Sequence, residues 1–183
     1  MLSATYSLVV LSTEQKKTST LLSELEKYVQ RRAAQNREPV DPVDLSETVH
    51  DLSRFHQYCQ ARKLEMVVIP AIRSASRMAD SLLDELESLS AQSVAMLAEL
   101  QQQLQLAFTY GSEKLAELQT VIELCCARLK RRLEIEENDL FALARDLLPI
   151  EAWFVIATKF LSIDAENGED RAPRPMLLRR AAL

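Results

Sequence analysis

Glycine is almost absent from this chain, which has only two glycines among its 183 residues. Aromatic residues make up 5% of the sequence. Tight turns between strands need residues at positive φ, for which glycine is the usual choice, and strands favour β-branched and aromatic residues. Leu, Ala, Glu, Gln, Arg and Lys dominate instead, and all of them favour helices. The sequence therefore predicts an all-α protein with a mainly aliphatic core.

Other features that the chain lacks limit its function and location. Its net charge of −5 leaves it without the basic excess that a general nucleic-acid binder needs to neutralise phosphates. The N-terminal apolar run, Tyr6 to Leu11, is too short for a signal peptide or a membrane span. The three cysteines form no CxxC pair, and an odd number suits a reducing compartment. We therefore expect a cytoplasmic protein that binds neither nucleic acid nor membranes.

Catalytic motifs are also lacking. The sequence has no glycine-rich phosphate loop, no G-x-S-x-G motif and no His–carboxylate pair at a useful spacing. The vicinal pair Cys125-Cys126 has two interpretations, a redox-active pair or two small thiols packed in a helix, and we favour the second. We expect a non-enzymatic protein without a cofactor.

Apolar residues recur at three- and four-residue spacing in four long segments, which predicts four amphipathic helices. Such helices with short links close most simply as an antiparallel up-down four-helix bundle. A short fifth helix is expected at Pro149–Leu161, so that residues 1–163 form the bundle and 164–183 a disordered tail. The expected landmarks are caps at Ser12 or Thr13 and at Asp44 or Ser46, a second helix running past Arg62, a kink or restart at Pro70, a third helix from Ser74 to Tyr110, and a cap at Ser112 after Gly111.

The segment Arg132–Trp153, RLEIEENDLFALARDLLPIEAW, resembles the last helix of the hemerythrin-like (HHE cation-binding) family. In that family a His stands four residues before a ligand Glu, and a Trp-containing helix follows. Here Glu136 stands at the Glu position and Arg132 at the His position. The segment QARKLEMVVIPAI resembles the family's H-x-x-x-E-x-x-x-x-FP motif, with Gln60 at the His position and Leu64 at the Glu position.

The resemblance implies a metal centre in the bundle core, with inward-pointing ligands from all four helices. The remaining ligand positions fall near Gln92 or Ser93 and near Glu14 or Gln15. Of the inward ligands, only Glu136 survives, so we expect a degenerate, metal-free member. Both histidines, His50 and His56, are expected at the surface or rim.

Arg132 has two interpretations. If it points inward, it pairs with Glu136 or Glu65 and fills the vacated site with a salt bridge. If it points outward, Lys130–Arg132 is a solvated basic rim, paired with carboxylates one turn on. We favour the second.

Three functions are considered. The first is a binding or regulatory protein that acts through protein–protein contacts, and we favour it. The second is an iron-binding oxygen or metal sensor with atypical ligands. The third is a transcription regulator, because RFHQYCQ and LKRRLEIEENDLF are similar to segments of bacterial regulators that bind the housekeeping sigma factor. For the first, a protein partner would dock on the acidic turn Glu134–Asp139 and the flanking basic rim Lys130–Arg132. The candidate binding residues are Gln60, Glu65, Arg132, Glu134, Glu136, Glu137 and Asp139.

Overall fold

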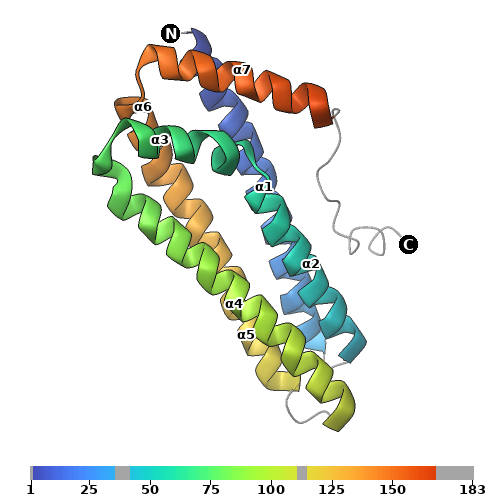
Figure 1. Cartoon of the computed structure of the whole chain (residues 1–183). Coiled ribbons are helices and arrows are strands. Elements are labelled where there is room, and N and C mark those ends of the chain that lie inside the picture. The colour runs from blue at the N-terminus through green and yellow to red at the C-terminus, as the bar shows by residue number, and fades with distance from the viewer. Residues whose placement is uncertain (1, 36–41, 111–114, 168–183) are drawn as a thin grey trace.

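The computed structural model describes residues 2–35, 42–110 and 115–167, and all regular structure in these ranges is helical. The prediction of an all-α protein is confirmed. Four long helices lie side by side and successive ones run in opposite directions (Figure 1). No helix within these ranges is long and apolar enough to cross a membrane. The long helices are α1 (Leu2–Gln35), α2 (Pro42–Gln60), α4 (Asp80–Tyr110) and α5 (Leu115–Ile135).

Two helix starts differ from the sequence prediction, because α1 and α2 both begin before the expected caps. α1 begins at Leu2, so Ser12 and Thr13 lie inside it. Ser7, Leu11 and Gln15 are buried at four-residue spacing, which continues the inward face to the start of the helix. α2 begins at Pro42, whose missing N–H costs nothing at the first helical position. Asp44 and Ser46 therefore do not cap α2.

The start of the third long helix was also predicted wrongly. α4 begins at Asp80 rather than Ser74, after a 3-10 turn, η2 (Arg77–Ala79). Ser76 caps this turn, because its hydroxyl accepts a hydrogen bond from the backbone N–H of Met78 at 3.1 Å. The predicted landmarks Gly111 and Ser112 lie outside the described residues.

A π-helical turn interrupts each of two helical stretches. After α2 ends at Gln60, the chain forms the π-helix η1 (Leu64–Val68) and then α3 (Ile69–Ala75). Pro70 lies in the first turn of α3, as expected for a helix that restarts there. α3 turns away from the direction of α2 and crosses the end of the long helices (Figure 1). After α5, the π-helix η4 (Glu136–Leu140) leads into α6 (Phe141–Leu147).

The last helix, α7 (Ile150–Asn167), is longer than the short helix expected at Pro149–Leu161. It includes residues 164–167, which the sequence had assigned to the tail; residues 168–183 lie outside the described ranges. α7 crosses the end of the molecule and packs against α1 (Figure 1). An ion pair of 2.6 Å joins Lys63 to Asp164, and the Lys63 ammonium lies 5.7 Å from the Phe160 ring centroid. These contacts join α7 to the start of η1.

The core consists of two hydrophobic clusters, one at each end of the long helices. Predicted stripe residues do not all reach it, since Met78 is 80% exposed and Val94 is 50% exposed. The helices α1, α4 and α5, and the chain that runs from α2 into η1, pass from one cluster to the other, and buried polar residues lie where they do so. The flanking core residues are Leu11 and Leu22 on α1, Cys59 on α2 and Leu64 on η1, Leu86 and Leu97 on α4, and Leu133 and Leu140 on α5 and η4.

Candidate functional site

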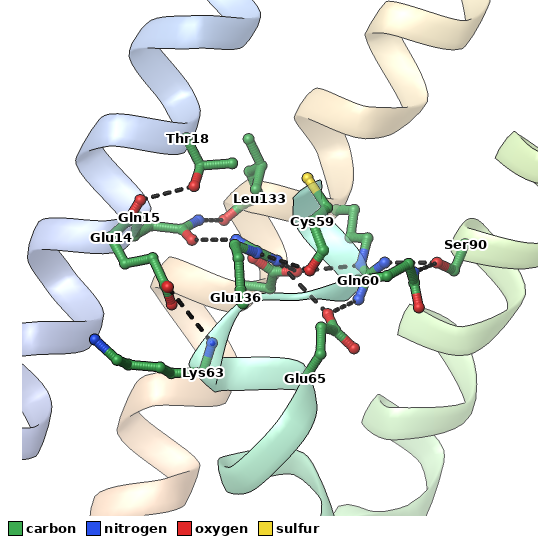
Figure 2. Close-up of polar contacts among 12 residues, drawn as sticks. Glu14, Gln15, Thr18, Cys59, Gln60, Lys63, Glu65, Ser90, Leu133 and Glu136 are labelled. Atoms are coloured by element: carbon green, nitrogen blue, oxygen red, sulfur yellow. Dashed lines mark hydrogen bonds and ion pairs between the residues drawn. The ribbon is translucent and has the colours of Figure 1, made fainter. Parts of the chain in front are cut away.

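Two arginines and two glutamates meet in the interior, between the two hydrophobic clusters. Together with Gln15 of α1 they form what we call the arginine–carboxylate layer: Gln15, Arg62, Glu65, Arg132 and Glu136. Gln15, Glu65 and Glu136 approach one another from three separate elements (Figure 2). Arg132 and Glu136 are two of the positions at which the sequence resemblance would place metal ligands.

Arg62 is the centre of the layer, and its side chain is 1% exposed. Its guanidinium donates at 2.7 Å to Oε1 of Glu136, at 3.0 Å to Oε1 of Gln15 and at 3.2 Å to the carbonyl of Cys59. Gln15 is held in turn, because its amide Nε2 donates to the carbonyl of Leu133 at 2.7 Å. Burial lowers the pKa of Arg62, but the charges and the hydrogen bond of its neighbours, Glu136 foremost, together raise it above the ordinary value. Arg62 is therefore a fixed buried cation.

Arg132 points inward and is buried, so the favoured outward interpretation is wrong for this residue. Its guanidinium pairs with Glu65 and donates to the Ser90 hydroxyl at 2.6 Å. Its Nε lies 3.1 Å from Oε1 of Glu136. The reason is helical periodicity: Arg132 and Glu136 are four residues apart, on the buried face that also carries Leu129 and Leu140. The neighbouring Lys130 and Arg131 are exposed, as expected for a rim.

Both carboxylates of the layer lie on π-helical turns. Glu65 is on η1 and Glu136 is the first residue of η4. π-helical turns are rare in proteins and occur often at functional sites. η1 contains Leu64 and η4 contains Leu140, and both leucines belong to the second hydrophobic cluster. The two turns bring both carboxylates into contact with both arginines.

The layer is balanced in charge but not fully hydrogen-bonded. Burial raises the pKa of Glu65, against the opposing effect of Arg132, and Arg62 also lies 3.6 Å from Glu65. All contacts of Glu136 use Oε1, while Oε2 is buried without a hydrogen-bond partner among the described residues. The Nε–H of Arg132 likewise makes no hydrogen bond to a described residue, although the ion pair is short. Such a layer costs desolvation free energy that its pairs only partly recover.

Two further titratable groups border the layer. His56 is 8% exposed, so the prediction of a surface or rim position is wrong for it, whereas His50 is exposed as expected. Burial and the Arg132 charge lower the pKa of His56. On the other side, Glu14 accepts a hydrogen bond from the backbone N–H of Lys63 at 3.4 Å, and burial raises the pKa of Glu14. Burial and the positive charge of Arg132 both disfavour the charged form of the His56 imidazole.

The seven predicted binding residues do not form one surface. Arg132 and Glu136 are buried, and the Glu65 side chain is 15% exposed. Gln60 is exposed, and its amide donates to the Ser90 hydroxyl at 2.9 Å. The other three, Glu134, Glu137 and Asp139, are exposed, unlike Glu136. The predicted docking surface is therefore corrected: Arg132 and Glu136 belong to the interior, and three carboxylates remain outside.

The donors of the layer do not fit a di-iron centre, which needs inward imidazoles and carboxylates from all four helices. Guanidinium groups stay protonated and do not ligate metals. Gln60 and Gln92 are exposed, Leu64 is apolar, and the Ser93 hydroxyl bonds to its own helix at Leu89. In the described parts of the chain, no group of three or more His, Cys, Asp or Glu side chains has a metal-binding arrangement.

The cysteines are buried thiols. Burial raises the pKa of Cys125 to about 11 and that of Cys59 to about 12, and it also raises the pKa of Cys126. The thiolate is the reactive form, so a raised pKa suppresses both oxidation and exchange. This favours the interpretation of Cys125-Cys126 as packed thiols.

Arg62, the central residue of the layer, was not among the predicted site residues. The sequence had extended the second helix through it. One signal was available in the sequence. Arg62 lies at helical spacing between Cys59 and Leu64, which both belong to the apolar pattern, and a solvent-exposed arginine is not expected at such a position. To recognise Arg62 as a buried residue, it would have been necessary to predict that α2 ends at Gln60, and no glycine or proline marks that end.

Comparison with protein families, curated proteins and solved structures gives no match for this chain.

Proposed function

We propose that this chain is a hemerythrin-like four-helix bundle in which the arginine–carboxylate layer has replaced the metal centre, and that it acts by binding another protein. The observation that carries the proposal is the contact of Arg62 and Arg132 with one oxygen of Glu136, at 2.7 and 3.1 Å. Glu136 is the one aligned carboxylate ligand that the sequence retains. The two guanidinium cations neutralise that carboxylate oxygen, as a bound metal ion would.

Electrostatics support a metal-free interior. The layer already holds two positive charges against two negative ones. A divalent cation placed beside Glu136 would meet both guanidiniums at short range, in a region of low dielectric where like charges repel strongly. An oxygen or metal sensor would need imidazole or carboxylate donors in place of Arg62 and Arg132. The structure gives that alternative no specific support.

A non-enzymatic role is supported by the same contacts. The side chains of Arg62 and Glu136 are at most 1% exposed and are engaged with each other. A catalytic acid, base or nucleophile must reach its substrate. The two segments that resemble sigma-factor regulators contain His56, Cys59, Arg132 and Glu136, which lie in the layer or at its border. Their role in packing the interior explains why these residues occur there, so the resemblance does not require that this chain binds a sigma factor.

The proposed docking surface is the exposed acidic group Glu134, Glu137 and Asp139, with Lys130 and Arg131 beside it. Arg131 lies 3.9 Å from Glu134, whereas Glu137 and Asp139 form no ion pair with any described residue. Unpaired surface carboxylates attract a partner of opposite charge, and this raises the association rate more than the affinity. The surface therefore fits a protein with a basic patch.

A pull-down from native cell extract tests this docking surface. The triple variant Glu134/Glu137/Asp139→Lys is expected to lose the protein that the wild-type chain captures, most clearly at low salt, because screening weakens surface charges. The matched control, Glu99/Glu117/Glu123→Lys, makes the same change of net charge at other exposed positions and should keep it. If both variants capture the same proteins as the wild type, or if the wild type captures none, the proposed surface is wrong.

A further inference from the structure

The outer surface formed by α7 and the first turns of α1 is unusually apolar. Among the described residues, thirteen large hydrophobic side chains are exposed, and seven of them lie on these two segments. The segments pack against each other across the end of the molecule (Figure 1). Exposed apolar patches of this kind mark interaction sites in soluble proteins. The seven residues are Leu2, Tyr6, Val9, Ile150, Phe154, Val155 and Leu161.

The outer face of α7 is suited to burial. Phe154 is 67% exposed, and Ile150 and Leu161 share its side of the helix. The two hydroxyls on this face already have partners: Thr158 donates to the carbonyl of Phe154 at 3.0 Å, and Ser162 donates to the carbonyl of Thr158 at 3.3 Å. A partner that covers this face would therefore not leave these two hydroxyl groups without a hydrogen-bond acceptor.

The charges of α7 point to a second copy of the same helix as the occupant. Glu151 and Lys159 are exposed, and they lie four residues before and four residues after Val155. In an antiparallel pair of α7 helices centred at Val155, each Glu151 faces Lys159 of the other copy. A two-fold interface brings the same surface of both subunits together, so each such pair forms twice.

The apolar residues fit the same register. Ile150 and Leu161 are nearly equidistant from Val155, so each lies opposite the other in the second copy. Phe154 is next to the centre, where the two rings meet. We propose that α7 is a self-association surface on which a second copy docks antiparallel about Val155. Since Lys159 is accompanied by several carboxylates on α7, this face does not suit an anionic lipid surface.

The size of the surface is compatible with a dimer. An α-helix of 18 residues is about 27 Å long. The α1 residues Leu2, Tyr6 and Val9 widen the apolar area, because α1 packs against α7. Specific dimers bury about 1,200–2,000 Å² in total, and the exposed apolar side chains of both segments are available for such a contact.

Sedimentation velocity of the full chain, over about 1–500 µM, tests the proposal. The wild type is expected to dimerise, and Phe154→Glu to raise the dimer dissociation constant by roughly 30-fold or more, as for a central aromatic contact. Val94→Glu is the matched control, since Val94 is 50% exposed on α4, away from the surface, and it should leave the constant unchanged. A wild type that stays monomeric would overturn the proposal and leave the face to residues 168–183 or to a different protein. A dimer unaffected by Phe154→Glu would overturn it as well.

A charge exchange tests the register itself. Glu151→Lys and Lys159→Glu each put like charges opposite one another twice, and each should weaken self-association about tenfold. An equimolar mixture of the two variants restores both opposite-charge pairs and should form heterodimers nearly as tight as the wild type. A mixture no tighter than its components would overturn the antiparallel register. These outcomes do not bear on the metal-free layer, because no residue of the layer is changed.

Discussion

Replacing Glu136 by Gln is expected to lower the free energy of unfolding by about 3–5 kcal/mol, because it leaves two buried guanidiniums facing Glu65 alone. Gln keeps the shape and one acceptor oxygen, so the change isolates the charge. Glu136 is fully buried, and bulk solvent cannot compensate the arginines. Denaturant unfolding followed by far-ultraviolet circular dichroism measures this loss as a shift in the midpoint with an unchanged slope.

The neighbouring Glu137 provides the control. It is exposed on the same π-helical turn, so Glu137→Gln should change the free energy of unfolding by no more than about 0.5 kcal/mol. If the two variants differ by less than about 1 kcal/mol, the layer is solvated and the description of Glu136 as a buried anion is wrong.

A fully apolar layer should be as stable as the wild type, or more stable by about 1–4 kcal/mol. The variant is Gln15→Leu, Arg62→Met, Glu65→Leu, Arg132→Met and Glu136→Leu. It removes both members of every ion pair within the layer, so the desolvation cost of these four charges disappears. Gln15 is included because its Oε1 would otherwise lose the Arg62 donor.

The comparison of Glu136→Gln with the apolar variant separates two quantities: the cost of breaking the ion pairs, and the net contribution of the whole layer to the free energy of unfolding. One substitution in the layer is expected to be costly, while five together are expected to recover that loss. The same unfolding experiment measures both. If the apolar variant is less stable than Glu136→Gln, the layer contributes net stability through its hydrogen bonds, and the view that it costs more than it recovers is contradicted.

Helix content and most of the core could be predicted from the sequence because amphipathic periodicity is a local signal. Leu22, Leu25 and Leu100 fall on the predicted stripes and are buried. Helix starts were less predictable where a good cap residue lies inside a longer apolar pattern. Ser12 and Thr13 could cap a helix, but packing continues the inward face of α1 past them to Ser7.

The site could be predicted only in part. The sequence identified the possible pairs of Arg132 with Glu136 and Glu65, since helical spacing and the resemblance pointed to them. It could not identify Arg62 or Gln15 as their partners, because those contacts join residues far apart in the chain. The direction of Arg132 depended on the same contacts. An arginine is stable in the interior only when several acceptors converge on it, and that convergence is a property of the fold.

The central claim, that an arginine–carboxylate layer stands where hemerythrin-like proteins hold metal, is tested most directly by the iron content of the purified chain. The protein is produced in iron-supplemented medium, purified without chelators and analysed by inductively coupled plasma mass spectrometry. Arg62 and Arg132 on Glu136 predict far less than one iron per chain and no oxo-bridge absorption. About two iron ions per chain, the content of a di-iron bundle, would contradict the account.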